Sequence, residues 1–203
     1  MKILAMVTMM ATAMAWAGES GRAQERKVMV CVDPSADGPQ IRSAEVLASR
    51  LFARIGVTID WRKLRSCPAS ENALQVSLSY QTPPEQRPGA LAYALPYERS
   101  HIVLFYDRIQ KSDPDLIKQR LAYVLVHEVT HMLEGITRHS KTGIMKAQWD
   151  REDRFEIGVG RLEFAPEDVD LIYRGLDARQ LSPTLGALAL ADPRNATSVA
   201  PQQ

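Results

Sequence analysis

The chain has 203 residues, of which 45% are hydrophobic and 24% are charged. These values are ordinary for a soluble globular protein, and the length suits one domain with a substantial core rather than two. The formal net charge is +1, so the composition indicates neither a nucleic-acid surface nor a strongly charged partner. We therefore expect no nucleic-acid partner, and we expect a monomer.

The first seventeen residues have the pattern of an export signal. Lys2 supplies a positive start, residues 3–16 are almost uninterruptedly apolar, and Ala17 ends a small-x-small cleavage sequence. The apolar run is shorter than the roughly twenty residues that a membrane span needs. We expect a signal peptide over 1–17, a mature chain that is secreted or periplasmic, and no stable membrane span after cleavage. Residues 18–27 would then be a short N-terminal segment.

Two cysteines, Cys31 and Cys67, remain in the mature chain. Both follow predicted strands joined by one helix, so they could lie at the same edge of neighbouring strands. An even pair in an oxidising compartment can form a disulfide. Two small core residues are an equally good interpretation at this stage.

The first half of the domain predicts a strand, a helix and further strands. Residues 28–32 form an apolar run, 40–55 have apolar side chains at helical spacing, and 57–64 alternate apolar and polar residues. This order predicts a right-handed β-α-β unit with parallel strands. Further strands are expected at the end of this half and just beyond it, at 74–80, 90–95 and 101–106. Prolines bracket the second of these, as an edge strand tolerates.

The second half predicts a buried helix and a closing helix. Asp113 offers an N-cap to a helix that runs to about residue 134 and is apolar on most sides, which is typical of a helix inside the domain. A last helix begins near Pro166. We expect a disordered tail over 181–203, because that stretch is rich in Ala, Pro, Ser and Asn without a clear pattern.

An H-E-x-x-H sequence lies on the expected buried helix. His127 and His131 are four residues apart, so both imidazoles project from one face and can share a tetrahedral metal. Glu128 stands beside them, where a carboxylate can take a proton from a metal-bound water. Two buried histidines are also costly unless something satisfies them. Hydrogen-bonded core histidines are the alternative, and the spacing favours the metal.

The stretch from His127 to Met145 resembles the metzincin clan of zinc peptidases, particularly its matrixin-like branch. That clan carries H-E-x-x-H-x-x-G-x-x-H followed by a turn with a methionine beneath the zinc. The resemblance implies that His139 is the third ligand of Zn2+ and that Met145 is the turn methionine. Gly135 lies four residues after His131 where the clan has three, and His139 lies eight after it where the clan has six.

Other third ligands remain open at this stage. In a gluzincin-like arrangement a later glutamate binds the metal, and Glu152 or Glu156 would be the candidates; a solvated charged face is the alternative for both. Glu134 shares the helical face of the ligands, so it could hydrogen-bond one of them or could cap the helix end through Arg138.

Three further side chains have two possible roles each. His101 opens a predicted strand and is expected to be an ordinary surface histidine. Trp149 and Tyr173 could reach the site and steady an oxyanion, but core packing is the favoured role for both. The edge strand over 90–95 could bind an extended peptide by strand addition.

Together these features predict one α/β (α+β) domain over 28–180, metzincin-like, with a mixed twisted sheet. The main hypothesis is an exported zinc metalloendopeptidase that acts on a peptide or protein substrate. Its metal would be held by His127, His131 and His139, with Glu128 as the general base. The alternative is a non-catalytic zinc-binding or interaction domain on the same scaffold.

Overall fold

The computed structural model describes residues 26–191 except for 37, 69–72, 95–99 and 112, and it describes side chains up to residue 180. The expected signal peptide, the segment before β1 up to residue 25 and the last twelve residues lie outside this part of the chain. Within it, no helix has the length and apolar character needed to cross a bilayer.

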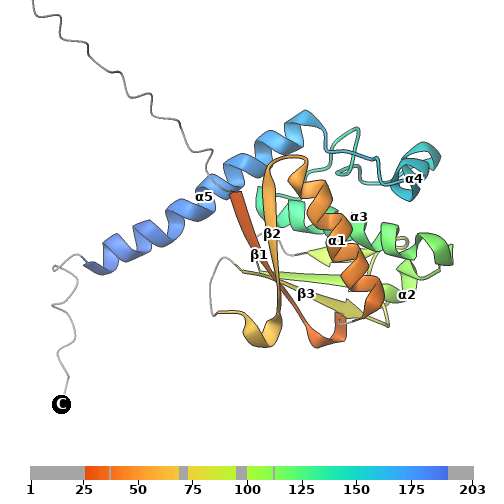
Figure 1. Ribbon diagram of the computed structural model, residues 1–203, viewed down its shortest axis with the longest axis horizontal. Coiled ribbons are helices and arrows are strands. Elements are labelled where there is room, and N and C mark those ends of the chain that lie inside the picture. The colour runs from red at the N-terminus through yellow and green to blue at the C-terminus, as the bar shows by residue number, and fades with distance from the viewer. Residues whose placement is uncertain (1–25, 37, 69–72, 95–99, 112, 192–203) are drawn as a thin grey trace, which may run out of the picture.

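A five-stranded sheet forms the centre of the described part of the molecule (Figure 1). Its strand order is β2-β1-β3-β5-β4, and β4 is antiparallel to β5 while the other pairs are parallel. The strands are β1 (Arg26–Val32), β2 (Val57–Lys63), β3 (Leu74–Ser79), β4 (Ala92–Ala94) and β5 (His101–Phe105). The mixed sheet with an antiparallel edge strand confirms the expected fold class.

Three long helices accompany the sheet, and two of them cover one of its faces. They are α1 (Pro39–Ala53), α3 (Ile117–Glu134) and α5 (Pro166–Ala191). Helices α1 and α3 pack against each other and both contact the sheet, so they lie on the same face (Figure 1). Helix α5 packs on α3, and its C-terminal part projects from the rest of the domain.

Helix α3 is the buried helix that the sequence predicts. Its start is prepared by Asp113, whose side chain accepts a hydrogen bond from the backbone N–H of Asp115 in the 3-10 helix η3 (Pro114–Leu116). Most of the helix is apolar, and twelve of its residues are buried. They are Leu121, Ala122, Tyr123, Val124, Leu125, Val126, His127, Val129, Thr130, His131, Met132 and Leu133. The helix therefore carries two histidines into the core.

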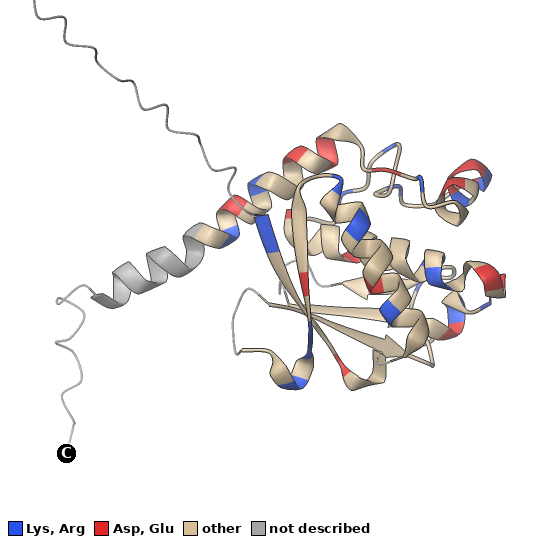
Figure 2. Ribbon diagram, in the orientation of Figure 1, with Lys and Arg blue, Asp and Glu red and all other residues tan. Residues whose placement is uncertain are grey.

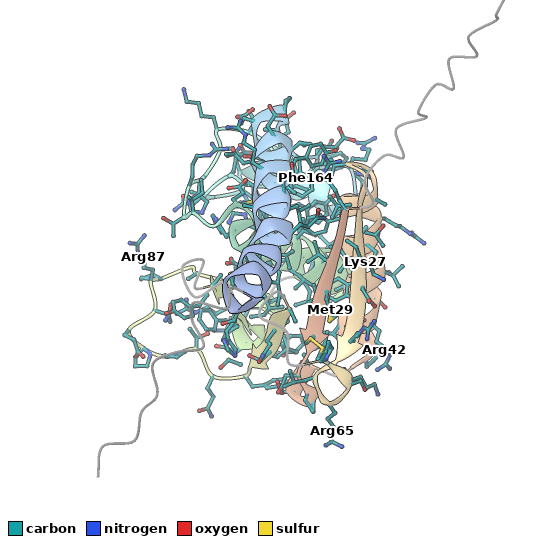
Figure 3. All side chains as sticks on the ribbon, turned by 90° about the vertical axis from the view of Figure 1, so that its left-hand side faces the viewer. Lys27, Met29, Arg42, Arg65, Arg87 and Phe164 are labelled. Atoms are coloured by element: carbon teal, nitrogen blue, oxygen red, sulfur yellow. A yellow bond between two sulfur atoms is a disulfide. The ribbon has the colours of Figure 1, made fainter. Side chains whose placement is uncertain are left out.

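The two cysteines form a disulfide. Cys31 lies on β1 and Cys67 follows β2, and their Cα atoms are 6.1 Å apart. Of the two interpretations left open by the sequence, the structure has the disulfide (Figure 3, yellow bond). It joins β1, the strand next to the edge, to the chain just beyond the edge strand β2.

Two features differ from the sequence prediction. Helix α4 (Arg151–Gly158) is not among the elements that the sequence predicts, because its residues are mostly charged. Helix α5 continues to Ala191, so the expectation of a disordered tail is wrong over 181–191. Alanine and leucine are frequent there and favour helix, which offsets the Pro and Gly of the same stretch. The remainder of the predicted tail, 192–203, lies outside the described residues.

Charged residues of both signs are interspersed along the helices, strands and loops (Figure 2). This distribution agrees with the net charge of +1.

Candidate metal centre

Three histidines converge at the C-terminal half of α3. His127 and His131 lie one turn apart on the helix, and His139 comes from the loop that follows it. The Nε2 atom of His131 is 3.1 Å from that of His127 and 3.3 Å from that of His139. The structure thus brings together the three imidazoles that the sequence and its resemblance to metzincins predict.

Backbone carbonyls fix the orientation of two of these rings. The Nδ1 of His127 lies 2.9 Å from the Ile144 carbonyl, and the Nδ1 of His131 lies 3.1 Å from the Ile136 carbonyl. A carbonyl oxygen only accepts, so each Nδ1 carries the proton and donates it. In a neutral imidazole the Nε2 atom then carries a lone pair. The two rings therefore turn their unprotonated nitrogens towards each other and towards His139.

Burial keeps the imidazoles neutral. It lowers the pKa of His127 to about 3 and that of His131 to about 4, helped in each case by a neighbouring imidazole of the triad. The pKa of His139 is lowered as well, by burial and by the Arg138 guanidinium. Neutral imidazole is the form that binds a metal.

The spacing of the nitrogens fits a tetrahedral zinc ion. Zinc binds imidazole nitrogen at about 2.0–2.1 Å, which places two ligand nitrogens about 3.4 Å apart in a tetrahedron. The observed separations of 3.1 and 3.3 Å are close to that value. The unprotonated Nε2 atoms of His127 and His131 cannot hydrogen-bond to each other at 3.1 Å, and a cation between them would relieve their repulsion. The residues present therefore fit zinc.

Glu128 follows the first histidine on α3 and is half-buried. Burial raises the pKa of its carboxyl group to about 7. A group with that pKa can take up and release a proton near neutral pH, which is what a general base that later acts as an acid requires.

A tight turn lies beneath the histidines. The backbone N–H of Ser140 donates to the Met145 carbonyl at 2.9 Å, which closes the loop between them, and Met145 is fully buried. Gly143 has φ of +75°, and a Cβ atom there would lie 2.5 Å from the Glu163 carbonyl oxygen, so only glycine fits. The turn ends in the Ile144 carbonyl that orients His127. Its sequence position is that of the expected methionine turn.

Trp149 supports this turn rather than lining a free site. Its indole N–H donates to the Ile144 carbonyl at 3.1 Å, the same oxygen that accepts from His127. Its ring also meets the His127 ring edge-on at a centroid distance of 5.9 Å. Packing, the favoured role, is thus its observed one, with an added hydrogen bond next to a triad ring.

Tyr173 and His101 lie elsewhere. The Tyr173 hydroxyl donates to the Ile55 carbonyl at 2.6 Å, and the Arg26 guanidinium sits 4.0 Å from its ring centroid. These contacts agree with a packing role. His101 is exposed at the start of β5 and pairs with the Ser100 hydroxyl at 2.8 Å, as expected of a surface histidine.

The glutamates considered as alternative ligands do not join the triad in the described part of the chain. Glu152 is exposed on α4, and Glu156 accepts from the Arg161 guanidinium at 3.1 and 3.2 Å. Neither role considered for Glu134 is found, because both its carboxylate oxygens are buried and neither has a hydrogen-bond partner among the residues that the structure describes. Burial and the nearby Asp168 charge raise its pKa to about 7.

Comparison with known proteins bears on the fold. The sequence matches no protein-family model and no curated protein. A solved structure of archaemetzincin from Methanopyrus kandleri is similar to this one, with a TM-score of 0.54 and 16% sequence identity; the match covers 78% of this chain and 99% of the archaemetzincin chain. The fold is metzincin-like. At this identity the likeness concerns the metzincin-like fold as a whole and does not single out the matrixin-like branch.

Proposed function

We propose that this metzincin-like chain is an exported zinc peptidase that hydrolyses peptide bonds. The observation that carries the proposal is the convergence of three neutral imidazoles with Nε2 separations of 3.1 and 3.3 Å. Two of them lie on the helix that also bears Glu128, and the third comes from the loop that follows it. A purely structural zinc site has no use for such a carboxylate. Among the described residues no fourth Cys, His, Asp or Glu joins the triad, which leaves a position for water, as in catalytic zinc sites.

The chain's own residues would divide the work as follows. His127, His131 and His139 would hold zinc, which when bound lowers the pKa of water and polarises the scissile carbonyl. Glu128 would take a proton from the attacking water and then give it to the leaving amine. The Ile136 and Ile144 carbonyls would keep His131 and His127 in the tautomer that presents Nε2.

The edge strand β4 supports a peptide as the substrate. The N–H of Phe105 donates to the Leu91 carbonyl, and Tyr93 pairs with Val103 two residues further along. In an antiparallel ladder the alternate residues, here Ala92 and Ala94, turn their backbone groups away from the partner strand. An extended peptide could pair with these groups by strand addition.

The variant Glu128→Gln tests the catalytic role. It replaces a carboxylate with an isosteric amide, so zinc should stay bound at one ion per chain while the rate of casein cleavage falls by about 100-fold or more. Metal analysis and a casein assay measure the two quantities. Glu152→Gln, an exposed glutamate on α4, is the matched control and should retain activity. A Glu128→Gln protein that cleaves casein as fast as the wild type would overturn the proposal.

Export is tested by the mass of the protein recovered outside the cytoplasm. Cleavage after Ala17 gives a mature chain that begins at Gly18. Intact mass spectrometry should show this chain. A retained Met1 in the exported protein would contradict the signal peptide.

A further inference from the structure

Asp168 links the two residues on either side of His139. Its carboxylate oxygen Oδ1 accepts a hydrogen bond from the Arg138 guanidinium at 2.6 Å and another from the Ser140 hydroxyl. Arg138 precedes the third histidine and Ser140 follows it. One carboxylate oxygen on α5 thus holds both flanks of that histidine.

The Asp168 side chain is fully buried, with no exposed area. A buried carboxylate is costly unless charges and donors compensate for its lost hydration. Arg138 supplies the opposite charge, and the position in the first turn of α5 adds the favourable end of the helix dipole. The second oxygen, Oδ2, has no hydrogen-bond partner among the described residues. A carboxylate that is buried at this cost is therefore expected to have a structural role.

Helix α5 holds Asp168 in a fixed place relative to α3. Gly175 packs so closely on α3 that a Cβ atom there would lie 1.8 Å from the Leu133 carbonyl oxygen. The Arg179 guanidinium donates to the Met132 carbonyl at 2.7 Å, which satisfies a carbonyl at the end of α3. Both contacts are with the last turn of the helix that carries His127 and His131. The position of Asp168 is therefore fixed relative to the His127 and His131 rings.

We propose that Asp168 is a positioning residue for His139, acting through Arg138 and Ser140. The loop from His131 to His139 is two residues longer than in the metzincin pattern, and a longer loop needs an anchor to hold its end in one place. The carboxylate supplies it by holding the chain on both sides of the ring. This inference rests on the proposed ligand set and says how its third member is held.

The test is the zinc affinity of the full mature chain, measured by competition with a chelator. Groups that hold a metal ligand in place typically contribute 10- to 100-fold to affinity. We expect Asp168→Asn to weaken zinc binding by about 10-fold, because the amide loses the charged pair with Arg138. In a His139→Ala background the same substitution should have no further effect, since the ring it positions is gone.

Two more variants separate positioning from general stability. Ser140→Ala removes one of the two hydrogen bonds and leaves the backbone bond from Ser140 to Met145 in place, so it should also weaken zinc binding. Asp153→Asn changes another buried aspartate, one that pairs with Lys146 and does not flank a ligand, and it should leave the affinity unchanged. The visible spectrum of the Co2+-substituted protein should change in Asp168→Asn and not in Asp153→Asn.

The outcomes distinguish the positioning role of Asp168 from the proposed set of zinc ligands. Loss of affinity in His139→Ala but not in Asp168→Asn would overturn the positioning role alone. Unchanged affinity in His139→Ala would overturn the ligand set itself. Equal losses from Asp168→Asn with and without His139 would show that the aspartate acts on the fold as a whole, and would also overturn the inference.

Discussion

At the scale of single residues, the protonation state of the triad links the site to stability. Burial holds the pKa of His127 at about 3 and that of His131 at about 4 in the folded, metal-free chain. In the unfolded chain both imidazoles return to a pKa near 6.5. Between these values the unfolded chain binds more protons at these two histidines than the folded chain does, so their contribution to folding stability falls as the pH falls.

We therefore predict that these two histidines progressively destabilise the metal-free protein below about pH 6.5, while the raised pKa values of Glu128 and Glu134 act in the opposite direction. The loss should approach about 1.4 kcal/mol per pH unit for each buried histidine. The difference between the wild type and His127→Gln in thermal unfolding between pH 7 and pH 5 measures the share of His127. His127→Gln should reduce the slope, while His101→Gln, which removes an exposed histidine outside the site, is the control. A slope that His127→Gln leaves unchanged would contradict the assignment.

Some residues of the site can be predicted from sequence and others cannot. His127, Glu128 and His131 follow from helical spacing alone, because the helix itself brings them together. His139 depends on resemblance to a family, since a loop of that length does not dictate where its end lies. The contacts of Asp168 depend on how α5 docks against the end of α3, and no local pattern encodes such a contact.

At the scale of elements, periodicity predicts what is long and amphipathic or buried. Helices α1 and α3 and the strands of the β-α-β unit fall into this class. Helix α4 does not, because it is short and mostly polar. A signal for it exists at its start, where Asp150 and Asp153 form a capping box. The position of α5 on α3 likewise depends on one small residue, Gly175.

Replacing that residue tests how the two helices fit together. Gly175→Ala places a methyl group 1.8 Å from the Leu133 carbonyl oxygen, which is backbone and cannot rotate away. We predict a loss of about 1–3 kcal/mol or more in the free energy of unfolding, together with weaker zinc binding. Chemical denaturation measures the first quantity. Gly158→Ala meets only a leucine side chain at 3.4 Å and is the control; an equally mild effect of both variants would contradict the close packing.

At the scale of the whole molecule, the disulfide and the proposed metal centre lie in different parts of the fold. A metal held by the triad would tie the end of α3 to the loop that follows it. The Cys31–Cys67 bond ties β1 to the chain beyond β2, at the side of the sheet opposite to β4. Because disulfides persist in oxidising compartments, this bond agrees with the proposed export.

Because the disulfide and the proposed metal centre lie apart, removing the disulfide should affect stability and not zinc binding. The disulfide spans 36 residues, and closing a loop of that length in the unfolded chain corresponds to about 4 kcal/mol in the chain-entropy model. The double variant Cys31→Ser, Cys67→Ser should therefore unfold roughly 10 °C below the wild type. Wild-type protein in a thiol reductant should unfold at the same temperature as the variant. The zinc affinity of the double variant should equal that of the wild type, because the triad is held by α3, the loop that follows α3, and α5. A loss of zinc affinity in the double variant would contradict this prediction and would show that the sheet edge and the metal centre form one cooperative unit.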